Sequence, residues 1–312
     1  MNMRLLINRN PALHCILRIP LAIRRRIIEQ LNRPAECVLQ RLDNLIVGDL
    51  NVFIKEFDGK FQLSPRSHLF HRIASKGFYE PELSSCFKSF IEPDRDVIDV
   101  GANVGFYTIL AGKQMQSGRV LAIEPTPQAF QRLQTNVVQN GVNSKTILVN
   151  GAASDEGGRQ LDLNTIPDKE EYASLGRLIH PAASKDRYTT VSVTTFTLDE
   201  LVEKYDLNPA IIKIDVEGAE AQVFSGASKI LSQHRPVIIS ELSNALLRDA
   251  GIRGVDIVAK IEEHDYIVTD PFDAKARPGC KEFGDILCIP KEKATINPAL
   301  LGASSVTSAQ DI

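Results

Sequence analysis

The sequence has few cysteines, five among 312 residues, and they are scattered with no C-x-x-C pair. An odd number of separated cysteines is not the framework of a disulfide-stabilised secreted domain, and it lacks the spacing typical of a zinc site. We therefore expect reduced thiols in a cytoplasmic protein.

Long apolar runs are also missing, since no stretch approaches the roughly 18 apolar residues that a membrane span needs. The N-terminus is a poor signal peptide because Arg18 and Arg24–Arg26 interrupt any apolar segment. The sequence contains no G-x-S-x-G, no Walker loop and no G-x-G-x-x-G fingerprint. The last absence counts against a nicotinamide-dependent Rossmann oxidoreductase, which stays open as the main alternative function.

Lysine is absent from residues 1–42, which carry eight arginines and two glutamates, so the remaining chain is distinctly acidic. A domain this acidic is a poor nucleic-acid binder, and we expect no nucleic-acid partner. Residues 11–31 place apolar side chains at loosely helical spacing with arginines between them. This pattern predicts a basic amphipathic helix that either contacts an anionic membrane or a partner peripherally, or packs against the rest of the chain.

From residue 96 the pattern alternates between short apolar strands and helices, which predicts an α/β fold with a parallel sheet covered on both faces. We expect core strands at 97–100, 120–123, 146–149, 210–214 and 237–239, and closing strands at 266–269 and 285–289. The helix after Thr126 is expected to be capped by that residue and to bury Phe130, Leu133, Val137 and Val138.

Outside this frame, residues 50–64 predict a small hairpin with a tight Asp58-Gly59 turn, and residues 66–90 predict one or two helices. Residues 154–190 interrupt the rhythm, so we expect a loop or hairpin over the active face, closing over the sheet edge and excluding water there. The chain then divides into a basic extension with a hairpin (1–64), a catalytic domain (65–291) and a disordered tail (292–312).

The first candidate site lies in the turn after the strand at 97–100. Gly101, Asn103 and Gly105 form a glycine-rich turn before a helix, where backbone N–H groups face a ligand. Asp99 ends the strand and can reach a cation. Glu124 ends the next strand, about twenty residues on, and can accept hydrogen bonds from ribose hydroxyls.

Small residues after the third strand, Gly151, Ala152 and Ala153, leave room for a flat base. A nucleoside with a cationic tail fits this set of residues, and S-adenosyl-L-methionine is such a ligand. Glu80, which lies before the first core strand, either folds back over this cofactor or is simply exposed.

A second candidate cluster follows the strand at 210–214. Lys213 and Asp215 leave the strand on one face, and a lysine in an apolar strand needs a partner such as Asp215 or Glu217. These three residues either orient and deprotonate an acceptor hydroxyl or form a structural ion pair. Glu217 and Glu220 also suit a helix N-terminus. Glu241, at the end of the fifth strand, adds another acid. Because Mg²⁺ favours oxygen ligands, a magnesium site among these acids is an alternative.

Two histidines, His68 and His71, are spaced to share one helix face. No other ligands lie nearby in the sequence, so we expect no metal site there.

Several of these segments together resemble the FkbM family of S-adenosylmethionine-dependent methyltransferases. They are Gly77–Glu80, Val97–Gly105, Ala122–Pro125, Leu198–Leu201 and Ile212–Glu220. The resemblance covers about residues 65–290 and is most specific in the run Lys-Ile-Asp-Val-Glu-Gly-Ala-Glu. It implies a class I methyltransferase fold, a Rossmann-like three-layer sandwich with a mostly parallel seven-stranded sheet and an antiparallel last strand.

The resemblance also implies methylation of a hydroxyl on a sugar, glycan or secondary metabolite. By its motifs, Asp99, Gly101, Asn103 and Gly105 would hold the methionine end of the cofactor, and Glu124 with Pro125 the ribose end. The motif leaves the general base undecided. A non-catalytic cofactor-binding protein, recruited through the basic N-terminus, remains a further alternative.

Overall fold

The computed structural model describes residues 48–166, 188–273 and 275–296. Residues 11–31 lie outside these ranges, so their contact with a membrane or a partner stays a prediction. Within the described ranges, no helix combines the length and apolar character needed to cross a bilayer.

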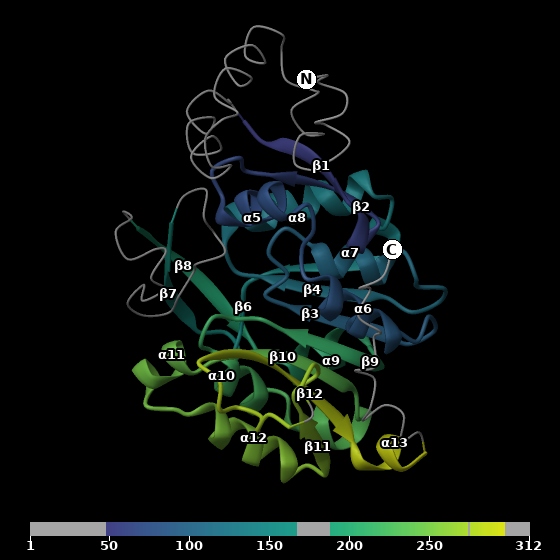
Figure 1. The fold of residues 1–312 in the computed structure, drawn as a ribbon, viewed down its shortest axis with the longest axis vertical. Helices are drawn as coiled ribbons and strands as arrows, with labels where there is room; N and C mark the ends of the chain where they lie inside the picture. Colours follow the sequence, from purple (N-terminus) through teal and green to yellow (C-terminus); the bar gives the residue numbers. More distant parts are fainter. Residues whose placement is uncertain (1–47, 167–187, 274, 297–312) are drawn as a thin grey trace, which may run out of the picture.

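A seven-stranded sheet runs through the centre of the fold (Figure 1). In spatial order its strands are β11 (Tyr266–Thr269), β12 (Phe283–Pro290), β10 (Val237–Ser243), β9 (Pro209–Ile214), β3 (Asp96–Val100), β4 (Val120–Glu124) and β5 (Thr146–Asn150). Strand β12 pairs antiparallel with both β10 and β11, whereas β10, β9, β3, β4 and β5 pair in parallel. The expected mostly parallel sheet with an antiparallel last strand is therefore confirmed.

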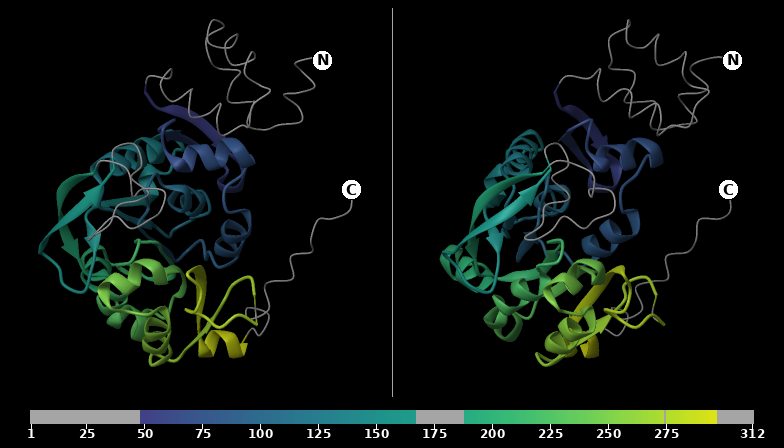
Figure 2. Two further views of the ribbon diagram at one scale, coloured as in Figure 1. Left: turned by 60° about the vertical axis from the view of Figure 1, so that its left-hand side comes forward. Right: turned by 90° about the vertical axis from the view of Figure 1, so that its left-hand side faces the viewer.

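Helices cover both faces of this sheet, as Figures 1 and 2 show. One layer contains α5 (His68–Lys76), α6 (Pro81–Ser89), α7 (Phe106–Gly112) and α8 (Pro127–Gln139). The other contains α9 (Leu198–Tyr205), α10 (Glu220–Ser225), the π-helical turn Ile230–His234, α11 (Asn244–Leu247) and α12 (Gly254–Glu262). Short 3-10 turns occur at Asn143–Lys145 and Arg248–Ala250.

Alternate residues of each buried strand enter one or the other helix layer, because successive strand side chains point to opposite faces. Ile211 and Ile239 belong to the core under α5–α8, whereas Ile212 and Ile238 belong to the core above α9–α12. Both faces are apolar, which explains why these strands are nearly continuous apolar runs in the sequence.

The hairpin before α5 consists of β1 (Leu50–Ile54) and β2 (Gly59–Leu63). The expected two-residue Asp58-Gly59 turn is wrong. A 3-10 turn (Lys55–Phe57) and a left-handed Asp58 connect the strands, and Gly59 already pairs with Ile54. The longer turn buries Phe57, whose ring stacks on Phe106 at 5.0 Å between centroids. The hairpin therefore shares a core with α7.

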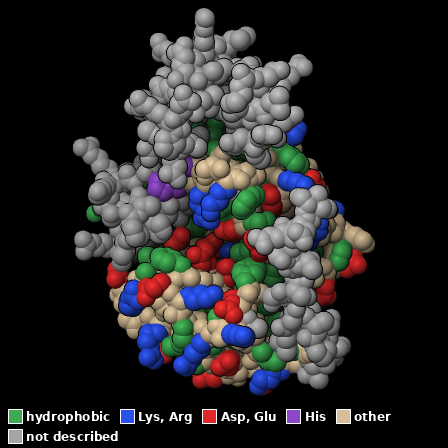
Figure 3. All heavy atoms as spheres, in the orientation of Figure 1, with side chains coloured by type: hydrophobic (Ala, Val, Ile, Leu, Met, Phe, Trp, Pro, Cys, Tyr) green, Lys and Arg blue, Asp and Glu red, His purple; other side chains and the backbone are tan. Residues whose placement is uncertain are grey.

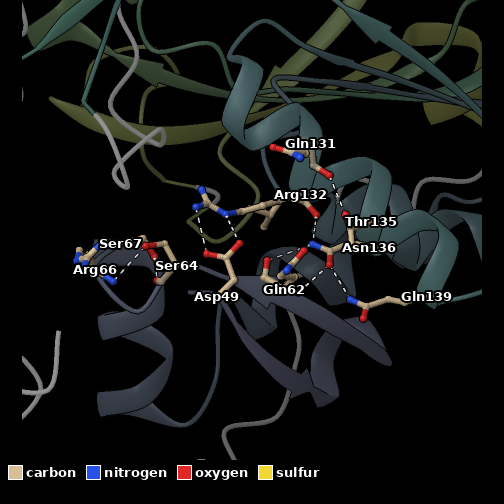
Figure 4. A network of polar contacts seen from close by, with 11 residues as sticks. Asp49, Gln62, Ser64, Arg66, Ser67, Gln131, Arg132, Thr135, Asn136 and Gln139 are labelled. Carbon is tan, nitrogen blue, oxygen red and sulfur yellow. Dashed lines mark hydrogen bonds and ion pairs between the residues drawn. The ribbon is translucent and has the colours of Figure 1, made fainter. Parts of the chain in front are cut away.

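Polar contacts tie this hairpin to α8 (Figure 4). Arg132 pairs with Asp49 at 2.9 Å. The buried Asn136 accepts a hydrogen bond from the Gln62 amide (2.7 Å) and donates one to the carbonyl of Val104 (2.8 Å). Since a buried amide is costly without partners, this network fixes the hairpin against the turn that precedes α7.

A second, three-stranded sheet interrupts the α/β rhythm. It contains β6 (Ala152–Ala153), β8 (Thr189–Phe196) and β7 (Gln160–Thr165), with β7 antiparallel to β8. The expectation of a hairpin in this region is confirmed for the described residues. The residues between β7 and β8, 167–187, lie outside them, so water exclusion by residues 154–190 stays a prediction.

Three local expectations are wrong. Val138 is 66% exposed, because it lies on the solvent side of α8 while Leu133 and Val137 are buried. Thr126 stands at the N-cap position, but its hydroxyl hydrogen-bonds Glu124 instead of the helix. Where a disordered tail is expected from residue 292, Lys291–Ile296 forms α13, with Ala294 buried in the core under α5–α8.

Candidate active site

A cleft with a volume of about 380 Å³ opens at the carboxyl ends of the parallel strands. Nearly all the site residues predicted from the sequence line it: Glu80, Asp99, Gly101, Asn103, Glu124, Pro125, Ala152, Ala153, Lys213, Asp215 and Glu217. Gly105 is the exception. Its φ is 95°, and a Cβ there would lie 2.6 Å from Leu133, so Gly105 allows α7 to pack on α8.

The glycine-rich turn is arranged differently from the expectation. The N–H groups of Gly101 and Ala102 donate to the carbonyl of Ile123, and that of Asn103 donates to Glu124 Oε2 at 2.8 Å. These groups therefore hold the turn against β4 instead of facing a ligand. Gly101 (φ 76°) is needed for close packing, because a Cβ there would lie 1.8 Å from the carbonyl oxygen of Asp215.

Asp99 and Glu124 are both buried and held by protein donors. Asp99 Oδ2 accepts from the Thr108 hydroxyl at 2.5 Å, and burial raises the pKa of Asp99 to about 6. Glu124 Oε1 accepts from the Thr126 amide (2.8 Å) and hydroxyl (2.6 Å), and burial raises its pKa to about 7. An ionised carboxylate has about four acceptor sites, so Glu124 retains capacity for one further donor beyond its three protein donors.

An apolar wall adjoins Glu124. Pro125, Ala152 and Ala153 line it from the main sheet and β6, and Leu163 lines it from β7. Gly151 is required for a reason other than the predicted space for a base, because a Cβ there would lie 2.5 Å from the Phe196 ring. Gly151 thus makes room for the protein itself, while the alanines border the cleft.

Lys213 is the only lysine lining the cleft among the described residues, and it is almost entirely buried. Its Nζ donates to Asp215 Oδ2 at 3.2 Å and lies 5.1 Å from the ring centroid of Tyr107. Burial lowers the pKa of Lys213, but the carboxylates around it, Asp215 first, outweigh burial and raise the pKa above its ordinary value. Lys213 is therefore a permanent cation that holds the Asp215 carboxylate.

Glu80, the residue that precedes α6, joins the same arrangement. Its Oε2 accepts a hydrogen bond from the Tyr107 hydroxyl at 3.0 Å, and the Tyr107 ring faces Lys213. The expectation that Glu80 folds back over the strand ends, and is not simply exposed, is thus supported by its place in the cleft lining.

Two further acids join this cluster, Glu241, which the sequence placed at a strand end, and Asp285, which the sequence did not single out. Glu241 lies within β10, which runs on to Ser243, and it faces Asp285 of β12 in the antiparallel register. Repulsion from Asp215, followed by burial, raises the pKa of Glu241 to about 8, and burial raises that of Asp285 to about 6. Glu241 stood at a strand end in the sequence, whereas only the antiparallel pairing brings Asp285 beside it.

The loop after β9 is shaped by its own acids. Glu217 is left-handed (φ 51°) and lines the cleft, while Glu220 Oε1 accepts from the Gly218 amide at 3.0 Å. Glu220 is buried outside the cleft lining, and burial raises its pKa to about 7. This hydrogen bond to the turn before α10 fits the expectation that Glu220 serves the helix N-terminus.

Helix α5 forms the facing wall. His68 lines the cleft and His71 does not, and their rings stack with centroids 6.4 Å apart. Among the described residues, no group of three or more potential ligand side chains is arranged to hold a metal ion. Figure 3 shows basic and histidine side chains above a hollow in which acidic side chains gather.

The strand order, the antiparallel last strand and the acids at the strand ends define a class I methyltransferase fold. A family model described as the methyltransferase FkbM domain matches residues 99–268, more than half of the chain. The chain therefore belongs to the FkbM methyltransferase domain family.

Curated relatives include the hexuronic acid methyltransferase AglP of Haloferax volcanii, 29% identical over 149 residues, covering 47% of this chain and 56% of AglP. The 2-O-methyltransferase NoeI of Sinorhizobium fredii is 28% identical over 154 residues, covering 46% of this chain and 62% of NoeI. The match thus spans less than two thirds of either relative. Among solved structures, a precorrin-6y C5,15-methyltransferase from Geobacter metallireducens aligns with TM-score 0.40 and 16% identity, over 68% of this chain and 87% of that chain.

Proposed function

We propose that this protein is an S-adenosylmethionine-dependent O-methyltransferase whose acceptor is a hydroxyl of a sugar, a glycan or a small metabolite. Family membership supports methyl transfer. The name of AglP, a hexuronic acid methyltransferase, supports a sugar acceptor, and the name of NoeI, a 2-O-methyltransferase, supports transfer to oxygen. The observation that carries the proposal is the contact between the two halves of the cleft. Gly101 packs directly on the carbonyl of Asp215, so the cofactor turn and the Lys213–Asp215 pair lie side by side.

The residues present fit the cofactor. Buried carboxylates at 99 and 124 suit its cationic and ribose groups, and the wall of Pro125, Ala152 and Ala153 suits a flat base. We assign Glu80, which also lines the cleft, to the amino group of the cofactor. When bound, S-adenosylmethionine supplies a methyl group already activated on a sulfonium.

The chain must then position an acceptor oxygen and remove its proton. We propose that the pair formed by Asp215 and Glu241 accepts the proton of the acceptor hydroxyl, while Lys213 holds the Asp215 carboxylate in place. A base of this kind typically contributes about 10²–10⁴-fold in rate. We assign Glu217, which lines the cleft two residues after Asp215, to contact with the acceptor.

Two alternatives are separable from this proposal. A nicotinamide-dependent oxidoreductase is disfavoured by the family and by the missing G-x-G-x-x-G. A non-catalytic cofactor-binding protein would bind S-adenosylmethionine without turning it over, and the cluster of acids around Lys213 counts against it.

The test is transfer of a radiolabelled methyl group from S-adenosylmethionine to a panel of neutral sugars, uronic acids and hydroxylated metabolites. The proposal predicts label on at least one hydroxylated acceptor and demethylated cofactor as co-product. Binding of NADH in place of S-adenosylmethionine would contradict it, and cofactor binding with no transfer to any acceptor would favour the non-catalytic alternative.

A further inference from the structure

Among the residues that the structure describes, one arginine lining the cleft, Arg72, has no carboxylate partner. Arg72 and His68 lie four residues apart on α5, so they share a face, and both line the cleft. Lys213, which also lines the cleft, is already paired with Asp215. Among the described residues, no carboxylate lies within ion-pair distance of Arg72.

The guanidinium of Arg72 is nevertheless held in place. Its central carbon lies 5.0 Å from the centroid of the Tyr79 ring, and that ring packs at 5.2 Å from Phe106. Stacking on an aromatic face leaves the planar edge of a guanidinium available for hydrogen bonds. That edge matches the two oxygens of a carboxylate.

The rest of the cleft is acidic. Its lining carries the carboxylates of Glu80, Asp99, Glu124, Asp215, Glu217 and Glu241. An anionic group on a ligand is therefore repelled over most of the cleft and attracted at the α5 wall, where Figure 3 shows basic side chains above the acidic hollow. A ligand with one carboxylate would bind in a single orientation.

We propose that Arg72, with His68 beside it, is a subsite for a carboxylate of a ligand in this cleft. The inference rests on the proposed function, because that function names the two ligands that could supply the carboxylate. One is the amino-acid end of S-adenosylmethionine, and the other is an acidic sugar acceptor.

The experiment compares Arg72→Gln with wild type on two ligand pairs that differ by one carboxylate. The first pair is S-adenosylmethionine and decarboxylated S-adenosylmethionine, measured by calorimetry. The second is a glucuronoside and the matching glucoside, measured by KM for methyl transfer and by direct binding. Lys76→Gln is the matched control, because Lys76 is an exposed base on the same helix and outside the cleft lining.

Arg72→Gln should weaken the carboxylate-bearing member of a pair by about tenfold to a hundredfold and leave its carboxylate-free partner unchanged. A loss confined to the first pair identifies the cofactor as the source, and one confined to the second identifies the acceptor. Arg72→Lys should give an intermediate loss, since it keeps the charge without the planar edge. Lys76→Gln should change neither pair.

Equal effects of Arg72→Gln on both members of each pair, or no effect on any ligand, would overturn the subsite. Failure of the proposed function has a different signature, in which wild type neither binds S-adenosylmethionine nor transfers its methyl group. In that case, the direct binding of glucuronoside against glucoside still decides for or against the role of Arg72.

Discussion

The two halves of the cleft treat their carboxylates in opposite ways. In the half formed by β3, β4 and α7, Asp99 and Glu124 are buried and surrounded by protein donors. In the half formed by β9, β10 and β12, Asp215, Glu241 and Asp285 share the single cation of Lys213 and repel one another. We propose that the first arrangement binds the cofactor. We propose that the second accepts the proton of the acceptor hydroxyl, because crowding among its carboxylates raises their affinity for a proton, as the raised pKa of Glu241 indicates.

Asp215→Asn should break the second half most strongly. It removes the carboxylate held by Lys213 while keeping the shape of the side chain, so methyl transfer should fall about 10²–10⁴-fold. Single-turnover rates at saturating acceptor measure the loss. Asp249→Asn, an exposed aspartate of the Arg248–Ala250 turn, should retain the wild-type rate. A wild-type rate of methyl transfer by Asp215→Asn would show that Asp215 is not part of the general base.

Lys213→Met should have the next largest effect, on stability. It leaves Asp215 and the neighbouring acids without the buried cation of Lys213. Breaking a fully buried pair costs about 3–5 kcal/mol, and solvent at the Asp215 side chain, which is 36% exposed, should reduce this loss. Chemical denaturation measures the free energy of unfolding. Lys229→Met, whose lysine is exposed, should unfold like wild type. Equal stability of both variants would show that Lys213 does not hold the acids together.

Glu241→Gln should reveal, through the pH dependence of stability, the proton that Glu241 retains above the usual range of a glutamate. The folded pKa of Glu241, about 8, lies above its unfolded value, so wild type loses stability as pH rises from about 4.5 to about 8. The variant lacks this loss and should exceed wild type by on the order of 3 kcal/mol at pH 8.5, with little difference near pH 4.5. Because repulsion from Asp215 is the largest cause, the difference should shrink in an Asp215→Asn background. A pH-independent difference in stability would contradict the raised pKa of Glu241.

Asp99→Asn should have the smallest of these effects and should act on the other half. The Thr108 hydroxyl can still donate to the amide oxygen, so the fold is kept while the negative charge is lost. Binding of S-adenosylmethionine should weaken by about tenfold, with Asp162→Asn, exposed on β7, as the control. Calorimetry measures both affinities, and unchanged binding would place the cationic end of the cofactor elsewhere.

The sequence predicted the central sheet well because its strands are short apolar runs that each end in a polar residue. Asp99, Glu124 and Asp215 were found in this way. Asp285 was not, because its relevance depends on the antiparallel pairing of β12 with β10, which no local pattern specifies. Arg72 was missed as well, because its place in the cleft lining and its contact with the Tyr79 ring depend on tertiary packing that no local pattern specifies.

The role of the glycine turn was predicted only in part. A glycine-rich turn between strand and helix usually implies free N–H groups, but here Ile123 and Glu124 take them. Likewise, the spacing of Asp58-Gly59 predicts a tight turn, and the burial of Phe57 overrides it. In both places tertiary packing decides between local conformations that the sequence permits.

The most direct test of the division between the two halves is a calorimetric titration of Asp215→Asn with S-adenosylmethionine beside the wild-type protein. If the halves are separate, the variant binds the cofactor within about twofold of wild type although it transfers no methyl group. Loss of cofactor binding in parallel with loss of transfer would contradict the account, because Asp215 would then belong to the binding half.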